Sequence, residues 1–549
     1  MLQKSSFTSI VVMLFLFSGI QQSVAQKKEN YISEVWVADQ GDGTYKNPIL
    51  HADYSDPDVV RVGDDFYMTA SSFNVAPGLP ILHSKDLVNW KLVGHALDRQ
   101  VPLNHFSEPQ HGNGVWAPAI RYHEGEYYIY WGDPDFGIYM VKTKDPEGEW
   151  EEPVLVEEGK GLIDPAPLWD DDGKAYLSHA YAGSRAGIKS ILVVKPMNAE
   201  GTKTTGAGKI VFDGHEDHPT VEGTKFYKRN GYYYIFAPAG GVSTGWQTIL
   251  RSKNPYGPYE EHISLEQGNT EINGPHQGAW IELENGEDWF IHFQDKEAYG
   301  RIVHLQPMVW ENDWPTMGKD EDGDGTGEPV LSHKKPNLSK EYPVVTPKDS
   351  DEFDGNDNGL QWQWQANPHA TWAFANPAKG QLRLYTQLLP ESAKNLWDAP
   401  NFLLQKFPAE EFTTSTKFTF HPNEDLQNEK AGLIVMGMSY AYLAVESTEN
   451  GTVIKYVVAE DAEHGKPEQE KVVGTLDGNA VHFRVKIDKG AKCTFSYSED
   501  GNNFTEVEET FTAVPGKWIG AKVGLFALKD QKTNDSGYAD FDYFRFTGN

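Results

Sequence analysis

Three carboxylate residues in the first half of the chain could together perform acid–base hydrolysis if the fold brings them to one site: Asp56, Asp164 and Glu222. Inverting hydrolysis of a glycosidic bond requires a carboxylic acid that protonates the leaving oxygen and a carboxylate that activates water from the opposite face, about 6.5–9.5 Å apart. A third carboxylate nearby raises the pKa of the acid, because negative charge disfavours its ionised form. Asp56 and Asp164 each precede a proline, and Asp–Pro pairs also simply begin turns. The three acids therefore need a common framework.

Five β-hairpin patterns indicate that framework. Each has a turn glycine followed by an alternating aromatic strand, and the glycines are Gly63, Gly125, Gly173, Gly231 and Gly286. Their spacing of about 48 to 62 residues fits one four-stranded propeller blade with variable loops. Residues 45–330 contain no long stretch with a 3.6-residue apolar period, so helices should be few and short. The sequence predicts a five-bladed β-propeller.

The strand before each hairpin turn is the innermost strand of its blade if the repeats are in phase, and its start then faces the central channel. Seven to ten residues before the turn glycines stand Asp56, Trp116, Asp164, Glu222 and His276. Three carboxylates, a tryptophan and a histidine should therefore converge on one axis. These five positions differ chemically, which favours one central active site over the repeated pockets of a lectin propeller.

A second domain is predicted after the proline-containing segment 342–347. Short alternating runs, such as 381–385 and 481–487, are separated by Gly, Asn and Asp turns. This is the pattern of a jelly-roll β-sandwich, here of about 200 residues. The chain is thus expected to be all-β, with a signal peptide, a propeller catalytic domain, a linker and a sandwich accessory domain at residues 1–25, 26–340, 341–348 and 349–549.

Several runs carry a family resemblance. Residues 47–67, 114–118, 163–165 and 221–223 resemble glycoside hydrolase family 43. The runs 351–355, 361–364 and 539–544 are similar to the C-terminal sandwich of the two-domain xylosidases and arabinofuranosidases of that family. The resemblance thus covers both predicted domains.

The resemblance implies a five-bladed, inverting enzyme in which Asp56 is the general base and Glu222 the general acid. Asp164 would modulate the pKa of the acid and orient it. All three coincide with the positions that the hairpin repeats bring to the axis. The sequence departs from the family pattern at Ser55, where a proline usually precedes the base.

The resemblance also suggests residues that hold the terminal sugar: Phe73, Trp116, His276 and Arg301. Trp116 could equally be an aromatic residue that packs between blades. His276 could be a hydrogen-bonded core histidine, and in related propellers an axial histidine can bind calcium or its water shell. Arg301 could form only a surface ion pair.

The function implied is an exo-acting hydrolase that releases terminal α-L-arabinofuranosyl residues from plant hemicellulose, that is, from arabinoxylan, xyloglucan or arabinan. β-D-xylosidase activity on xylo-oligosaccharides, or both activities together, is the alternative, because the two terminal pentoses can present similar hydroxyl patterns. A noncatalytic carbohydrate-binding propeller is the alternative of another class. No cofactor is required.

Composition limits the partners. The formal charge of −32 argues against nucleic acid and anionic membranes, and the 13% aromatic content suits sugar faces. The start of the chain has a lysine, an apolar run over residues 10–17 and small residues at 23 and 25, which predicts a secretory signal. We expect a mature protein without an integral membrane segment, exported to the periplasm or, alternatively, secreted.

Metal sites are not firmly predicted. Glu352 and Asp542, from the first and last sandwich strands, could share a structural calcium ion. The acidic loop 320–325 resembles the start of an EF-hand, but Leu331 stands where the closing glutamate belongs. We interpret it as a solvated turn. The single cysteine, Cys493, is interpreted as a small buried strand residue.

Overall fold

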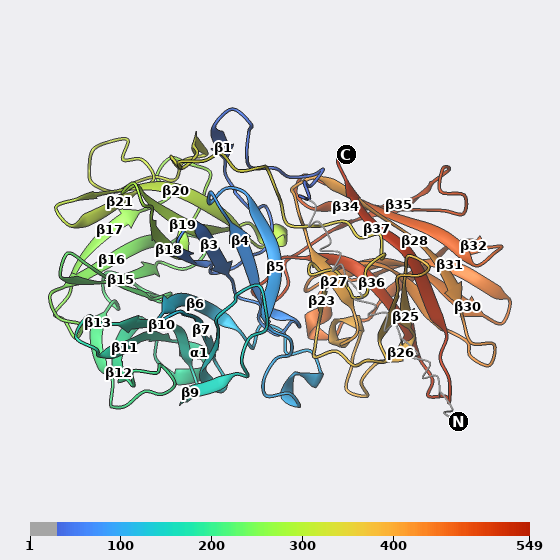
Figure 1. Ribbon diagram of the computed structural model, residues 1–549. Coiled ribbons are helices and arrows are strands. Elements are labelled where there is room, and N and C mark those ends of the chain that lie inside the picture. Colours follow the sequence, from blue (N-terminus) through green and yellow to red (C-terminus); the bar gives the residue numbers. More distant parts are fainter. Residues whose placement is uncertain (1–29) are drawn as a thin grey trace, which may run out of the picture.

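The computed structural model describes residues 30–549, so the predicted signal peptide lies outside the described residues. Figure 1 shows a blue-to-green propeller beside an orange-to-red sandwich. Among the described residues, helices are limited to α1 (Gly183–Ala186) and four single 3₁₀ turns of three residues each. The all-β prediction, with few and short helices, is confirmed.

The propeller consists of five four-stranded antiparallel sheets, each built from four consecutive strands. This confirms the five blades predicted from the turn glycines. The strands are β2–β5 (Asp58–Val62, Asp65–Thr69, Gly78–Ser84, Trp90–Leu97), β6–β9 (Trp116–His123, Glu126–Asp133, Gly137–Thr143, Val154–Glu158), β10–β13 (Leu162–Trp169, Ala175–Tyr181, Ile191–Met197, Lys209–Asp213), β14–β17 (Lys225–Arg229, Tyr232–Ala239, Trp246–Ser252, Glu260–Leu265) and β18–β21 (His276–Glu282, Asp288–Asp295, Arg301–Glu311, Trp314–Met317).

The first strands of the blades face one another around the axis. Strand β2 contacts β6 and β18, and β10 contacts β6 and β14. Near the start of each first strand one residue has positive φ, which turns the chain sharply at the channel. These residues are Asp56, Ala117, Asp164, Gly223 and Gln277, with φ between 36° and 65°. Two predicted axial residues thus occupy the kink, whereas Trp116, Glu222 and His276 precede it by one residue.

The propeller ring is closed outside the blades. Strand β1 (Thr44–Lys46) pairs antiparallel with β22 (Ser332–Lys334), which joins the segment before the first blade to the segment after the fifth. An isolated bridge between Leu50 and Val303 adds a direct link to the last blade. The two ends of the ring are therefore held by backbone hydrogen bonds.

The sandwich consists of a seven-stranded and an eight-stranded sheet. Alternate residues of β28 point into the core, as expected for a strand with one buried face. The buried side chains between the sheets include Cys493, as predicted. The first sheet has the order β24, β25, β37, β28, β33, β34, β35 (Ala373–Asn376, Gln381–Tyr385, Tyr538–Thr547, Phe412–His421, Ala480–Asp488, Lys492–Ser498, Thr505–Thr512). The second has the order β23, β27, β36, β29, β30, β31, β32 (Gln363–Trp364, Leu403–Lys406, Lys522–Lys529, Lys430–Met436, Tyr440–Thr448, Gly451–Ala459, Gln469–Leu476), and β26 (Gln387–Leu388) pairs with β36.

The two domains are joined by backbone hydrogen bonds as well as by apolar contacts. Ala76 of the propeller forms a β-bridge with Trp364 of the sandwich. Tyr299 lies in the sandwich core cluster and donates its hydroxyl to the carbonyl of Glu410 over 2.9 Å. Ala521 N–H donates to the carbonyl of Ala298 over 2.7 Å. The sandwich therefore packs directly against the propeller segment that precedes Arg301.

Candidate active site

The carboxylate of Asp56 is held by three donors from different parts of the propeller. It is 6% exposed, and its Oδ2 accepts the hydroxyls of Ser55 and Ser71 over 2.7 and 2.6 Å. Arg301 Nη1 lies 3.4 Å from both carboxylate oxygens and donates to Ser55 Oγ over 2.8 Å. Ser71 Oγ in turn accepts Ala117 N–H over 2.7 Å. These contacts fix the direction of the carboxylate.

Ser55 and Ser71 are thus site residues that the sequence did not single out for a role. Ser55, the departure from the family pattern, links the base carboxylate to Arg301. Ser71 stands in the loop after β3, and no motif marks it. Only the spatial approach of this loop to the kink before β2 reveals its contact.

Asp164 and Glu222 form the second group of carboxylates. Asp164 is 4% exposed, and its Oδ2 accepts Gly223 N–H over 2.6 Å. Its pKa lies well above the usual range, because burial removes water from the carboxylate and because the charges of Glu222 and Asp56 are near. Asp164 therefore retains its proton at a pH at which an exposed carboxyl group would lose it.

Glu222 precedes β14 and keeps contact with solvent. Its side chain is 33% exposed, and its Oε1 lies 3.5 Å from Nε2 of the buried His276. Its backbone N–H donates to the carbonyl of Pro238 over 3.1 Å, which anchors the segment before the strand. A partly exposed carboxyl group beside a buried one can meet a ligand that enters the channel.

The ring of Phe293 lies between Arg301, which contacts Asp56, and His276, which contacts Glu222. The Arg301 guanidinium lies 5.0 Å from the Phe293 ring centroid, and the His276 and Phe293 rings are 5.4 Å apart. Arg301 is 8% exposed, so the structure does not place it in a surface ion pair. Neither ring nitrogen of His276 has a hydrogen-bond partner among the described residues, and Glu222 Oε1 lies 3.5 Å from Nε2.

An aromatic wall completes the site. Phe73, at φ 51°, forms a bridge with Val115 and lies 6.4 Å from Trp116 between ring centroids. Trp116 lies 6.3 Å from Trp518, whose ring centroid is 6.0 Å from the Arg301 guanidinium. The structure therefore brings together all seven sequence-predicted residues and adds Trp518, which belongs to the sandwich.

Trp518 reaches the propeller because glycines allow the two domains to approach closely. A Cβ at Gly112 would lie 2.9 Å from Trp518 Cδ1 and 2.6 Å from a Lys517 carbon. Gly520 N–H donates to Asp53 Oδ2 over 3.0 Å, and the other oxygen of Asp53 accepts Arg301 N–H over 2.9 Å. Asp53 therefore ties the Trp518 loop to the strand that begins at Arg301.

The predicted calcium pair in the sandwich is not assembled. Both carboxylate oxygens of Glu352 are taken by Arg545, at 2.6 and 2.7 Å. Asp542 instead pairs with Lys417 at 2.5 Å and accepts from Gln381 over 2.8 Å. Each acid is therefore neutralised by a different cation.

His276 does not assemble a protein ligand set for calcium either. Calcium takes six to eight oxygen ligands, whereas the one carboxylate oxygen within 4.0 Å of His276 among the described residues belongs to Glu222. The unpartnered ring nitrogens of His276 fit a water molecule or a ligand hydroxyl. A calcium ion at this position stays a prediction.

Two other groups of possible metal ligands occur among the described residues. Asp320, Asp322 and Asp324 lie in the acidic loop, where Asp320 accepts the N–H groups of Gly323 and Gly325 over 2.7 and 3.0 Å. These contacts agree with the interpretation as a turn.

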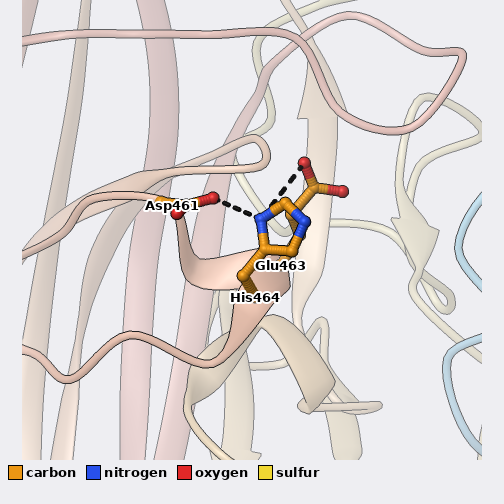
Figure 2. Close-up of side chains that lie close together, drawn as sticks. All are labelled: Asp461, Glu463 and His464. Atoms are coloured by element: carbon orange, nitrogen blue, oxygen red, sulfur yellow. Dashed lines mark hydrogen bonds and ion pairs between the residues drawn. The ribbon is translucent and has the colours of Figure 1, made fainter.

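The second group is Asp461, Glu463 and His464 of the sandwich (Figure 2). His464 Nδ1 lies 2.5 Å from Asp461 and 3.9 Å from Glu463. Lys466 pairs with Asp461 at 2.9 Å and Lys517 with Glu463 at 3.8 Å. Because these lysines already supply positive charge, the cluster does not call for a cation.

None of the helices in residues 30–549 has the length and apolar character needed to cross a membrane. The export signal itself falls on residues that the structure does not describe.

Comparison with known proteins identifies the family. Residues 45–315 match Glycosyl hydrolases family 43, and residues 350–547 match the Beta xylosidase C-terminal Concanavalin A-like domain. A β-xylosidase of Formosa agariphila is 34% identical over 556 residues, which cover 92% of this chain and 91% of its own. A non-reducing end α-L-arabinofuranosidase of Bacteroides ovatus is 31% identical over 539 residues, with 92% and 94% covered.

A solved structure shares the arrangement of both domains. The chain is similar to a family 43 protein of Bacillus licheniformis, with a TM-score of 0.78 and 28% identity over 92% of this chain and 100% of that one. The match extends over the propeller and the sandwich, as the sequence resemblance implied. With two family matches in order along the chain and full-length relatives above 30% identity, the protein belongs to glycoside hydrolase family 43.

Proposed function

We propose that the protein is an exo-acting, inverting hydrolase of terminal pentose units in plant hemicellulose oligosaccharides, with β-D-xylosides as its main substrates. The observation that carries this proposal is that the three carboxyl groups lie in different environments. Asp56 is surrounded by hydroxyl and guanidinium donors, whereas the buried Asp164 has a raised pKa and lies near the partly exposed Glu222. An inverting reaction needs one ionised and one protonated carboxyl group.

In the proposed reaction, Asp56 accepts a proton from a water molecule whose oxygen attacks the anomeric carbon. Glu222 donates its proton to the departing glycosidic oxygen as that bond breaks. The products are the free terminal sugar, with inverted anomeric configuration, and the remaining oligosaccharide with a new hydroxyl group. Asp56 then loses its proton to solvent, and Glu222 regains one from solvent. Asp164, which is buried and accepts the N–H of Gly223, positions the neighbouring Glu222 for this proton transfer.

The aromatic wall supports action at chain ends. Phe73, Trp116 and Trp518 follow one another in edge contacts, and Trp518 lies 6.0 Å from the Arg301 guanidinium. Because aromatic faces and edges pack well against sugar rings, this wall suits a single terminal unit whose hydroxyls are met by Arg301 and His276. No organic cofactor takes part in the proposed reaction.

Xylose is preferred over arabinofuranose on the strength of the relatives. The Formosa protein, named a β-xylosidase, is 34% identical, and the Bacteroides protein, named an α-L-arabinofuranosidase, is 31% identical. The arabinofuranosidase activity predicted from the sequence is therefore the second candidate, and a bifunctional enzyme would combine the two. The catalytic carboxylates serve either sugar equally, so the choice depends on the pocket that surrounds them.

The test is the release of p-nitrophenol from its β-D-xyloside and its α-L-arabinofuranoside, measured in parallel for the wild type and Glu222→Ala. The proposal expects turnover of the xyloside to dominate and to fall strongly in the variant. Dominant turnover of the arabinofuranoside would select the second candidate. Equal rates for wild type and variant on both substrates would contradict the role of Glu222.

A further inference from the structure

Two lysines of the sandwich lie opposite each other at the domain interface. Lys406 in β27 and Lys522 in β36 are direct partners in the antiparallel register. Both ammonium groups donate to one oxygen, Gln363 Oε1, over 3.2 and 3.0 Å. Like charges directly opposite on neighbouring strands repel each other, and here a single amide oxygen stands between them.

No carboxylate compensates this pair. Among residues 30–549, no carboxylate oxygen lies within 4.0 Å of either ammonium nitrogen, although ion pairs occupy many other lysines of the chain. Burial lowers the pKa of both lysines, that of Lys522 most strongly, and the acid that favours their charged forms is Asp53. Its two oxygens already accept the backbone N–H groups of Arg301 and Gly520. Lys522 is only 4% exposed, and a buried charge without a partner is costly.

A cavity of about 70 Å³ adjoins this pair between the two domains. Lys406, Gln363 and Tyr54 line it, and the Lys406 ammonium lies 5.4 Å from the Tyr54 ring centroid. A cavity that holds even one water molecule needs only about 10–15 Å³ on the same measure. The cavity therefore has room for a small polyatomic ion as well as for water.

The walls of the cavity offer hydrogen-bond donors that have no acceptor. Gln405, 2% exposed, has an amide Nε2 without a partner, and His51, 3% exposed, has neither ring nitrogen bonded. A neutral imidazole carries one N–H, and an amide nitrogen can only donate. The one carboxylate in the wall, Asp349, is already satisfied by the hydroxyls of Tyr31 and Ser33.

We propose that this interdomain cavity binds a small inorganic anion, chloride or phosphate, held by the Lys406 ammonium and the Gln405 amide with Lys522 and His51 nearby. The anion compensates the lysine pair where the sandwich meets the propeller. Because Asp53 links the same region to Gly520 and Arg301, a bound anion stabilises the docking that brings Trp518 to the active site.

The experiment is thermal unfolding of the full chain at fixed pH and ionic strength, with sodium gluconate replaced stepwise by sodium chloride and, separately, by sodium phosphate. Binding to the folded state raises Tm with the logarithm of anion concentration, and at ten times Kd it favours the folded protein about elevenfold. We expect the Tm of the wild type to rise with chloride, with phosphate or with both. Because the two anions are added in separate titrations, each titration shows whether its own anion binds. Lys406→Met should be insensitive to the replacement.

Lys492→Met is the matched control, because Lys492 is exposed in β34 of the same domain and its loss should leave the anion response of the wild type intact. A wild type without a response, or a Lys406→Met variant with the wild-type response, would overturn the proposal. If Lys406→Met does not fold, soaked crystals of the wild type decide the question. An anomalous bromide peak within about 3.5 Å of Lys406 Nζ, or phosphate density there in crystals soaked in phosphate, supports the site, and the absence of both overturns it. Neither readout depends on hydrolytic activity.

Discussion

Trp518 of the sandwich lies edge-on to Trp116 of the propeller, with ring centroids 6.3 Å apart and ring planes at 69°. The two residues are about 400 positions apart in the chain, and each belongs to a different domain. Trp518 is 48% exposed, and its ring centroid lies 6.0 Å from the guanidinium of Arg301, the residue that contacts Asp56. The sandwich is thus a structural part of the candidate active site.

Removal of the Trp518 side chain should reduce catalysis and leave the fold intact. Loss of the wall loosens the position of the terminal sugar, and misplacement of about 1 Å can cost about 100-fold in rate. We expect Trp518→Ala to lower kcat/KM on the preferred p-nitrophenyl pentoside about 10- to 100-fold, with Tm close to that of the wild type. Phe374→Ala, which removes another exposed sandwich aromatic, is the control. Equal kcat/KM for the two variants would contradict a role for Trp518.

Replacement of Glu222 should affect poor leaving groups most. A general acid contributes about 10²–10⁴-fold where the leaving oxygen needs a proton, and a dinitrophenolate, a much weaker base than p-nitrophenolate or a sugar alkoxide, leaves with little help. Glu222→Gln should therefore lose far more activity on xylobiose than on dinitrophenyl xyloside. Stopped assays on the two substrates give the ratio, and an equal loss on both would argue that Glu222 is not the acid.

The raised pKa of Asp164 predicts how stability depends on pH. Between the unfolded pKa near 4 and the higher folded pKa, the folded carboxyl group keeps a proton that the unfolded chain has lost. Stability therefore falls as pH rises through that window. Asp164→Asn removes this penalty, so we expect a higher Tm than the wild type at pH 7–8, no difference at pH 4, and loss of activity.

Asp133 offers a matched control for this effect. Burial raises its pKa to about 7, so the same reasoning predicts that Asp133→Asn gains stability above pH 7. Asp133 makes none of the contacts that join the site carboxylates, and its variant should retain activity. Calorimetry at several pH values measures both variants. A Tm of Asp164→Asn below that of the wild type at pH 8 would contradict the buried, protonated state of Asp164.

The two serines at Asp56 should differ in their effect on stability. Ser55→Ala and Ser71→Ala each remove one hydroxyl donor from the carboxylate, and we expect each to lower kcat about tenfold, the effect of about 1.4 kcal/mol. Ser71→Ala also leaves the buried N–H of Ala117 without its acceptor. An unsatisfied buried donor costs about 1–3 kcal/mol, so the urea midpoint should drop further for Ser71→Ala. The reverse order would contradict this assignment.

The propeller was predictable because each blade repeats its own local signal. A turn glycine followed by an alternating strand marks every hairpin. Asp56, Asp164 and Glu222 each stand in or just before the first strand of such a hairpin, so the same local signal locates them. The position of each axial residue relative to the positive-φ kink was predictable only to within one residue. Asp56 and Asp164 occupy the positive-φ kink, whereas Glu222 precedes the kink at Gly223, because the number of residues between kink and turn varies among blades.

The contribution of the sandwich could not be predicted from local patterns. Trp518 follows Pro515 and Gly516 in what looks like an ordinary turn, and nothing in its neighbourhood indicates that it contacts Arg301. The contact arises from domain docking, in which Asp53 receives Gly520 N–H. Local patterns also gave no sign that strand register places Arg545 beside Glu352 and Lys417 beside Asp542, the two acids considered for a shared calcium ion.

The central claim is single-displacement hydrolysis by Asp56 and Glu222, and proton NMR of the first sugar released tests it most directly. With a β-D-xyloside substrate, the account predicts that the α-anomer of xylose forms first and that the β-anomer grows in only as the sugar mutarotates. If arabinofuranoside is the preferred substrate, the first product should be the β-anomer of arabinose. Release of xylose first as the β-anomer, which is retention of configuration, would contradict the account.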